Sequence, residues 1–127
     1  MNRADVQSWL DAYVEAWRQN RPEPIEALFT EDAVYRFRPY AGEGRAVEGI
    51  ADIVSSWVES EGSGRWAASY QPYAVDGDRA VAIGTSRYYA SDDESEEVYH
   101  NCSLLRFDDG GRCAEFTEYW MLEPKDG

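Results

Sequence analysis

The second half of the chain consists of four strand-like segments separated by short turns, and few folds accommodate this pattern. The segments are rich in β-branched and aromatic side chains and span residues 65–75, 79–89, 98–107 and 112–122. Asp76-Gly77 separates the first pair, and Asp109-Gly110 separates the last pair. Asp-Gly between two strand patterns is a strong hairpin signal. These residues therefore predict an antiparallel meander.

The first half has a different periodicity, because its apolar residues recur every three or four positions. This spacing predicts helices over residues 3–19 and 46–60, with a short helix beginning at Pro24 between them. A strand is expected over residues 33–37. Helices followed by a meander indicate an α+β fold rather than alternating βαβ units. The 127 residues contain no linker-like stretch, which favours a single domain over residues 1–127.

Composition narrows the classes of partner. The net charge of −13 opposes binding to nucleic acid or to an anionic membrane, since both need clustered Lys and Arg. No apolar stretch approaches the ~20 residues of a membrane span, and the N-terminus does not resemble a signal peptide, so we expect a cytoplasmic protein. Aromatic residues make up 14 % of the chain, and gaps between such rigid rings can hold a ligand.

The last hairpin places polar groups among rings. If Asp109-Gly110 is its turn, Asn101 lies opposite Glu118, and one face carries Tyr99, Asn101, Ser103, Leu105, Ala114, Phe116, Glu118 and Trp120. This face is the more apolar one, so we expect it to lie under the helices. Desolvation would raise the pKa of a carboxyl group there, which suits a general acid or base. Alternatively, Glu118 only fixes the register through a bond to Asn101, and a one-residue bulge would exchange the faces.

The other face of this hairpin is expected to be the outer one, with His100, Cys102, Leu104, Arg106, Cys113, Glu115, Thr117 and Tyr119. We then expect His100 to be a packed or interface residue, although a bulge before Asn101 would favour a catalytic role, so its role stays open. The two cysteines are too far apart along the ladder for a disulfide. A zinc site is not expected in a chain with one histidine, and the glycines match no phosphate-binding motif. The direction of Arg87, which could pair with Glu118, stays open.

Several segments together resemble the SnoaL-like branch of the nuclear transport factor 2-like superfamily over nearly the whole chain. They are WLDAYVEAW at 9–17, IEALFTEDAVY at 25–35, LLRFDDGGR at 104–112 and EYW at 118–120. The resemblance implies a curved, mostly antiparallel sheet that forms a cone, closed by N-terminal helices around an internal pocket. It also implies a homodimer formed through the outer sheet face, as in many members.

The family includes ketosteroid isomerases, polyketide cyclases, dehydratases, epoxide hydrolases and non-enzymatic domains. By this resemblance, Tyr13 matches the isomerase tyrosine that donates to the substrate oxygen. The isomerase base falls near Phe37 and its protonated aspartate near Ser103, so steroid isomerisation by that mechanism is not expected. The epoxide hydrolase Asp-Arg-Asp arrangement is not recognisable either.

Three functions remain open at this point. The first is an acid/base enzyme without cofactor or metal that acts on a small, apolar, carbonyl-bearing molecule, with Glu118, Tyr13, Asn101 and Ser103 as catalytic candidates. Its expected pocket wall consists of Trp17, Tyr35, Phe37, Trp57, Trp66, Tyr99, Phe116 and Trp120. The second is a module that binds such a molecule without converting it, or that serves for dimerisation. The third is a structural homodimer with a filled core.

Overall fold

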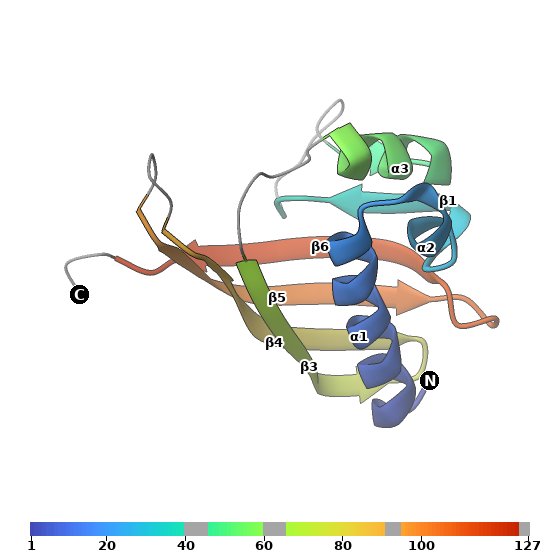
Figure 1. The fold of residues 1–127 in the computed structure, drawn as a ribbon. Helices are drawn as coiled ribbons and strands as arrows, with labels where there is room; N and C mark the ends of the chain where they lie inside the picture. Colours follow the sequence, from blue (N-terminus) through green and yellow to red (C-terminus); the bar gives the residue numbers. More distant parts are fainter. Residues whose placement is uncertain (40–45, 60–65, 91–94, 125–127) are drawn as a thin grey trace.

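The structure of the chain, a computed structural model, describes residues 1–39, 46–59, 66–90 and 95–124 (Figure 1). Some sequence features lie outside this part: most of the Gly-containing segment 38–45, which is expected to be a loop, Gly62 and Gly64, which are expected to end the third helix, and Asp92-Asp93-Glu94 of an acidic run expected to be a loop tip. The side chain of Trp57 also lies outside the described residues, so its predicted place in the pocket wall is not addressed.

Three helices form where the apolar periodicity predicts them. They are α1 (Arg3–Gln19), α2 (Pro22–Glu26) and α3 (Ile50–Glu59). A capping box begins α1, in which the side chain of Asn2 accepts from the Asp5 amide at 2.8 Å and the Asp5 carboxylate accepts from the Asn2 amide at 3.0 Å. Asn20, with φ of 51°, ends this helix in the left-handed conformation. The short helix α2 begins at Pro22 rather than Pro24, because proline suits a first helical position whose N–H needs no partner.

Six strands form one sheet in the order β2-β1-β6-β5-β4-β3. They are β1 (Phe29–Arg36), β2 (Ala46–Glu48), β3 (Trp66–Asp76), β4 (Arg79–Tyr88), β5 (Glu97–Phe107) and β6 (Cys113–Leu122). The four predicted strands β3 to β6 form the antiparallel meander, and β1 joins it by pairing in parallel with β6. The predicted α+β class with a mostly antiparallel sheet is confirmed.

The prediction of one helix over residues 46–60 is wrong at its start. Residues 46–48 form the edge strand β2, which pairs antiparallel with the end of β1. Gly49 follows with φ of 87°, a conformation that interrupts a helix and that glycine adopts without strain. The helix therefore begins only at Ile50.

The register of the last hairpin differs from the predicted one by two residues. Ser103, not Asn101, lies opposite Glu118, and Leu105 lies opposite Phe116. The cause is a turn one residue longer than expected, in which the Asp108 carboxylate accepts from the amides of Gly110 and Arg112, together with a bulge between Arg106 and Phe107 that adds the second residue. Because the shift is an even number of residues, the side chains that were predicted to share the inner face still share it.

A bulge corrects the placement of one cysteine. The register of β5 and β6 shifts between Arg106 and Phe107, so that Phe107 pairs with Cys113. Cys113 consequently lies in the core and is fully buried, although the sequence predicted it on the outer face. Both cysteines are free thiols.

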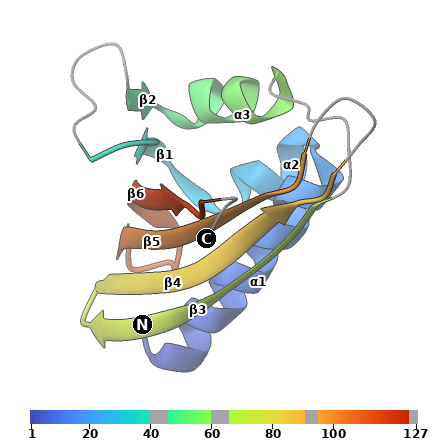
Figure 2. The same ribbon diagram turned by 90° about the vertical axis from the view of Figure 1, so that its left-hand side faces the viewer.

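The core lies between α1 and the inner face of the sheet, as Figures 1 and 2 show from two sides. Trp9 on α1 is central to it: its ring meets Phe29 and Phe107 edge-on, and its indole N–H donates to the Leu28 carbonyl at 3.0 Å. The helices α2 and α3 close the end of the molecule formed by β1 and β2. Helix α1 covers the inner face toward the opposite edge of the sheet, where it packs against β3.

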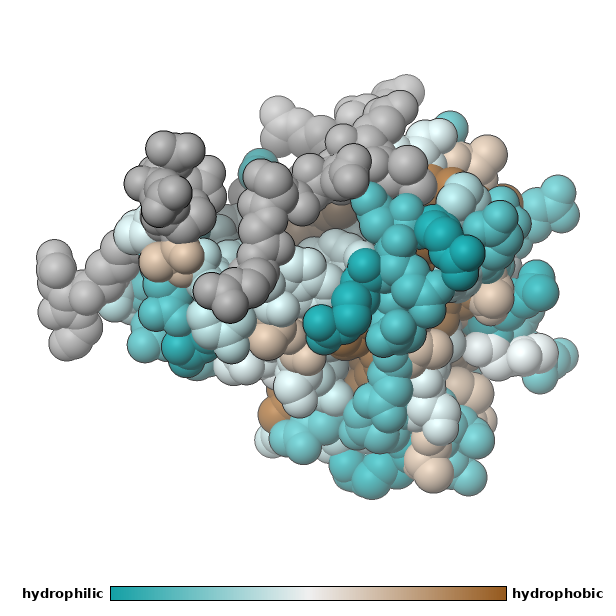
Figure 3. All heavy atoms as spheres, viewed as in Figure 1, coloured by the Kyte–Doolittle hydropathy of each residue, from teal (hydrophilic) through white to brown (hydrophobic). Residues whose placement is uncertain are grey.

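Hydrophilic residues cover much of the described surface on the helical side (Figure 3). Among the described residues, no helix is both long enough and apolar enough to cross a membrane.

Candidate functional site

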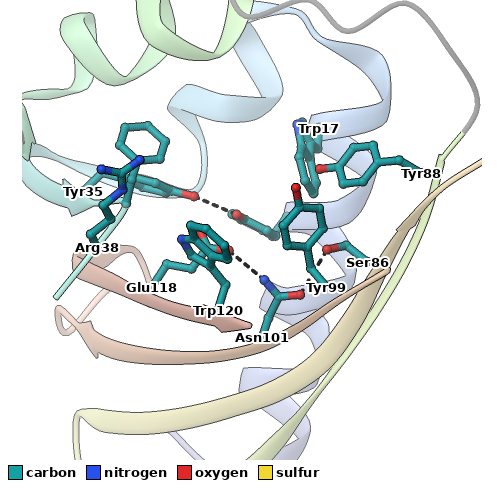
Figure 4. Close-up of a pocket in the computed structure, with 11 residues that line it drawn as sticks. Trp17, Tyr35, Arg38, Ser86, Tyr88, Tyr99, Asn101, Glu118 and Trp120 are labelled. Carbon is teal, nitrogen blue, oxygen red and sulfur yellow. Dashed lines mark hydrogen bonds between the residues drawn. The ribbon is translucent and has the colours of Figure 1, made fainter. Parts of the chain in front are cut away.

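The inner face of the sheet and α1 enclose a cavity of about 470 Å³ (Figure 4). Its lining comes from four strands, the helix α1 and the segment after β1. The lining residues are Tyr13, Trp17, Tyr35, Phe37, Arg38, Ser86, Tyr88, Tyr99, Asn101, Glu118 and Trp120. Seven of these eleven side chains are aromatic, so the cavity can hold a flat, largely apolar molecule.

Glu118 carries the acidic group of this lining. Side chains alternate along β6, which turns Glu118 to the inner face between Phe116 and Trp120. Its Oε1 accepts a hydrogen bond of 2.8 Å from Nδ2 of Asn101, and Oδ1 of Asn101 accepts one of 3.0 Å from the Ser86 hydroxyl. Figure 4 shows Asn101 between these two partners. A row of bonds thus crosses β4, β5 and β6 and ends at the carboxyl group.

Burial changes the acidity of this carboxyl group. Desolvation raises the pKa of Glu118 from 4.5 to about 7, although the bond from Asn101 acts in the opposite direction. A carboxyl group with this pKa exists in both protonation states near neutral pH. It can therefore accept a proton and give it back under the same conditions.

Two phenol groups form the second polar feature of the cavity. The hydroxyl groups of Tyr13 and Tyr35 are hydrogen-bonded at 2.8 Å. Both rings stack on Phe116, with centroid distances of 5.3 Å for Tyr13 and 4.6 Å for Tyr35, so both are held rigidly. Burial raises the pKa of each phenol well above its usual value, with the charge of Glu118 acting in the same direction. Both hydroxyl groups are therefore protonated and can act as hydrogen-bond donors.

Four further rings form a continuous aromatic wall. Trp17 meets Tyr88, Tyr88 meets Tyr99, and Tyr99 meets Trp120, each pair in or near an edge-to-face arrangement. Trp120 is 46 % exposed, which places it at the mouth of the cavity. The wall thus runs from Trp17, near the C-terminal end of α1, to solvent.

The structure brings most of the predicted site residues together. Glu118, Asn101 and Tyr13 line the same cavity, as do the predicted wall residues Trp17, Tyr35, Phe37, Tyr99 and Trp120. Three others lie elsewhere. Ser103 is buried beside the cavity without lining it, Phe116 belongs to the core beneath it, and Trp66 packs behind Trp17 at 4.7 Å.

Sequence reasoning missed three lining residues: Arg38, Ser86 and Tyr88. The signal for the last two was present, because Ala82, Gly84, Ser86 and Tyr88 alternate along β4 as small residues followed by a ring. That pattern indicates the face that lies under a close-packed partner. Arg38 follows the end of β1, and nothing in its surroundings in the sequence indicates where it points.

Two residues whose roles the sequence left open point away from the cavity. Arg87 forms a salt bridge of 2.8 Å with Glu96, so it is not the partner of Glu118. His100 lies on the outer face, where its Nε2 is 2.9 Å from a Glu123 carboxylate oxygen. Among the described residues, no group of three or more His, Cys, Asp or Glu side chains is arranged to hold a metal ion.

Comparisons with known proteins give the family. A comparison with curated proteins finds no match. Among solved structures, a protein from Bacillus subtilis described as a "putative isomerase" superposes with a TM-score of 0.71 at 20 % identity, covering 95 % of this chain and 90 % of that one. An epoxide hydrolase from M. tuberculosis, described as "LEH-like", superposes with a TM-score of 0.68 at 15 % identity, covering 94 % of this chain and 84 % of that one. At these identities the likeness shows a shared fold. The SnoaL-like domain family matches residues 10–116, and the chain belongs to this family.

Proposed function

We propose that this protein is a cofactor-independent acid/base enzyme that moves a proton on a small, largely apolar molecule bearing a carbonyl group. The observation that carries the proposal is the environment of Glu118. This carboxyl group lines an aromatic cavity, and its burial raises its pKa to about 7. Titratable groups with such shifts concentrate at catalytic sites, because an acid/base catalyst works best when its pKa is near the working pH.

The proposed step assigns one role to each polar feature. The Glu118 carboxylate takes a proton from the carbon next to the carbonyl, and the electron pair of that C–H bond moves onto the carbonyl oxygen. A hydroxyl of the Tyr13–Tyr35 pair donates to this oxygen as its negative charge grows. If the same carboxyl group then returns the proton to another carbon of the enolate, the net reaction is an isomerisation. In a ring closure the enolate carbon instead attacks a second carbonyl carbon of the same molecule, and the carboxyl group gives its proton to the alkoxide that forms. A good donor to such an oxygen contributes roughly 3–4 kcal/mol to transition-state stabilisation.

The shape of the cavity supports the substrate class. Its volume of about 470 Å³ lies within the usual range for small-molecule sites, roughly 300–1,000 Å³. The wall from Trp17 to Trp120 presents ring faces and edges, which favour a flat or cyclic compound. A filled core, the third possibility that the sequence left open, is not favoured by a cavity of this size. The hydrolase and isomerase descriptions of the two superposed proteins are compatible with proton-transfer chemistry in this fold.

Hydrogen–deuterium exchange tests this reaction class without knowledge of the natural substrate. Cyclic ketones and aromatic ketones of suitable size are incubated with the protein in D2O, and exchange at the carbon next to the carbonyl is followed by NMR. We expect the protein to accelerate exchange for part of the panel. Glu118→Gln should lower the acceleration by about 10²–10⁴-fold, because it removes the proton acceptor.

Glu115→Gln is the matched control for this experiment. Glu115 lies on the same strand but on the outer face, where it is 3.4 Å from Arg106. This variant should exchange ketone protons as fast as the unmodified protein. Equal rates for Glu118→Gln and the unmodified protein would remove Glu118 from the mechanism.

A non-catalytic binding module is the second candidate, and one observation favours it. Phe37, at the position where the resemblance places the base of ketosteroid isomerases, lines the cavity with a side chain that cannot accept a proton. Binding of the ketone panel, seen as a rise in melting temperature, without any accelerated exchange would support this candidate against the enzyme.

A further inference from the structure

The row of hydrogen bonds that ends at Glu118 contains two buried residues, Ser86 and Asn101, to which the proposed reaction assigns no role. Ser86 is 3 % exposed and Asn101 is 8 % exposed, so both are cut off from bulk water. The Ser86 hydroxyl donates to Oδ1 of Asn101, whose Nδ2 donates to Oε1 of Glu118. Three strands thus contribute one residue each to a single chain of bonds, and Tyr70 on β3 interacts with Ser86 at its far end.

The donors of this chain all point the same way. Ser86 has one hydroxyl proton, and it gives this proton to Oδ1 of Asn101. With Oδ1 of Asn101 held by a donor, the NH₂ group of the amide must face Glu118. Hydrogen bonds aligned in one direction strengthen one another in a low-dielectric interior.

The sheet is shaped to hold Tyr70 in this place. Tyr70 pairs directly with Gly84 across β3 and β4, and Ser86 is two residues further along β4 on the same face. A Cβ atom at Gly84 would collide with the Ser69 carbonyl and with the ring and Cα of Tyr70. Glycine at this position therefore lets the ring lie across β4 with its hydroxyl at Ser86.

We propose that Ser86, with Tyr70 behind it, is a positioning residue that locks the amide of Asn101 and thereby decides which oxygen of Glu118 carries the proton. Oε1 receives a donor from Asn101, so a proton on that oxygen would meet another hydrogen. The proton must then reside on Oε2, the oxygen that Asn101 does not hold. The proposal rests on the proposed function in one respect only, namely that this proton is the one exchanged with a substrate.

Fixing the orientation of the Asn101 amide has a measurable consequence for the pKa of Glu118. If Ser86 no longer donates, the amide of Asn101 can turn and present Oδ1 to a protonated Glu118. This favours the neutral carboxyl group and raises its pKa. Other titratable or charged groups line the same cavity from the surrounding elements, and they stay unchanged in the variants below: Tyr13 on α1, Tyr35 and Arg38 at β1, Tyr88 on β4 and Tyr99 on β5.

The experiment is a pH titration of the Glu118 carboxyl carbon by ¹³C NMR, with the signal identified by its loss in Glu118→Gln. Ser86→Ala should raise the pKa of Glu118 by about one unit, the size expected for one lost hydrogen bond to a charged group. Tyr70→Phe should raise it less, because Ser86 can still donate. Ser86→Thr keeps the hydroxyl and should restore the original pKa.

Thr85→Ala is the matched control, because Thr85 is exposed and faces the other side of β4. Near-ultraviolet circular dichroism reports whether each variant keeps its packing. If Ser86→Ala perturbs the fold, Asn101→Leu can be titrated in its place, because it removes the donor to Glu118 altogether. In this variant the pKa of Glu118 should rise by at least as much as in Ser86→Ala. An unchanged Glu118 pKa in a folded Ser86→Ala or Asn101→Leu protein would overturn the proposal, as would a shift that Ser86→Thr does not reverse.

This titration and the ketone exchange experiment separate the two proposals. A Glu118 pKa that responds to Ser86 in a protein without exchange activity would support the lock and reject the enzyme. Glu118-dependent exchange with a pKa that ignores Ser86 would reject the lock and keep the enzyme.

Discussion

Glu118 shows how one side chain can oppose the stability of the fold while giving the site its chemistry. An ionised carboxylate among aromatic rings loses most of its hydration, and a single donor from Asn101 compensates only in part. The free energy of unfolding should therefore depend on pH through this residue. The same burial that makes the group costly also brings its pKa close to neutrality.

Glu118→Gln should stabilise the protein at alkaline pH. The pKa of Glu118 is raised from 4.5 to about 7 in the folded state, so the folded protein holds this proton more tightly than the unfolded chain. The residue costs no stability below pH 4.5, and the cost grows as pH rises to about 7. We expect the variant to gain at most about 3 kcal/mol at pH 8 and almost nothing near pH 4.

Urea unfolding at pH 4, 6 and 8 measures this difference. Glu115→Gln again serves as the control, since no large pH-dependent gain is expected for a half-exposed residue in an ion pair with Arg106. A gain for Glu118→Gln that is the same at all three pH values would show that the carboxylate is not destabilised by burial.

At the scale of elements, the meander was the easiest part to predict from the sequence. Its strands are marked by their own residues and by the Asp-Gly turns, and the structure reproduces all four to within one residue or so. The long helix α1 was equally clear, because its apolar stripe and its flanking residues agree. These elements are determined by residues close to one another in the sequence, and the spacing of apolar residues reports such local structure.

Features that depend on distant partners could not be predicted in this way. The strand β2 forms because its three residues pair with the end of β1. The parallel pairing of β1 with β6 joins segments about 80 residues apart, as the bond of Arg36 to Thr117 shows. The turn at Asp108 and the bulge after Arg106 together changed the register by two residues without changing the faces. For that reason Glu118 was placed correctly on the inner face while its cross-strand neighbour was not.

Gly84 is the element-scale position most sensitive to substitution. A Cβ atom there would overlap backbone and ring atoms of β3, and neither can move without parting the two strands. Gly84→Ala should therefore lower the free energy of unfolding by roughly 3 kcal/mol. In Gly110→Ala, by contrast, the new methyl group would have the Asp108 carboxylate at 3.5 Å as its closest contact, and the loss should stay within about 1 kcal/mol. Chemical denaturation of both variants checks the difference, and equal losses would contradict it.

At the scale of the whole molecule, the outer face of the sheet carries apolar side chains that are exposed in the described part of the chain. Leu104 and Tyr119 are each 43 % exposed there, and Met121 is 71 % exposed. We expect this face to form a homodimer. Association should strengthen with salt, because the net charge of −13 makes two copies repel each other and ions screen that repulsion.

Sedimentation velocity at micromolar concentration tests this expectation. Leu104→Glu should give monomers by placing a charge in the contact, whereas Ala51→Glu, on the exposed side of α3, should leave the dimer intact. Monomers of the unmodified protein at both low and high salt would contradict the prediction.

The parallel pairing of β1 with β6 also has a consequence for the chain as it is being made. On the ribosome, α1 and β1 emerge early, but the strand that anchors β1 is added about 80 residues later. Until then β1 lacks its partner in the sheet, and the inner face under α1 lacks Phe116 and Glu118 of β6. Part of the core therefore stays accessible until the last strand is made, which makes the early segments natural clients of holding chaperones.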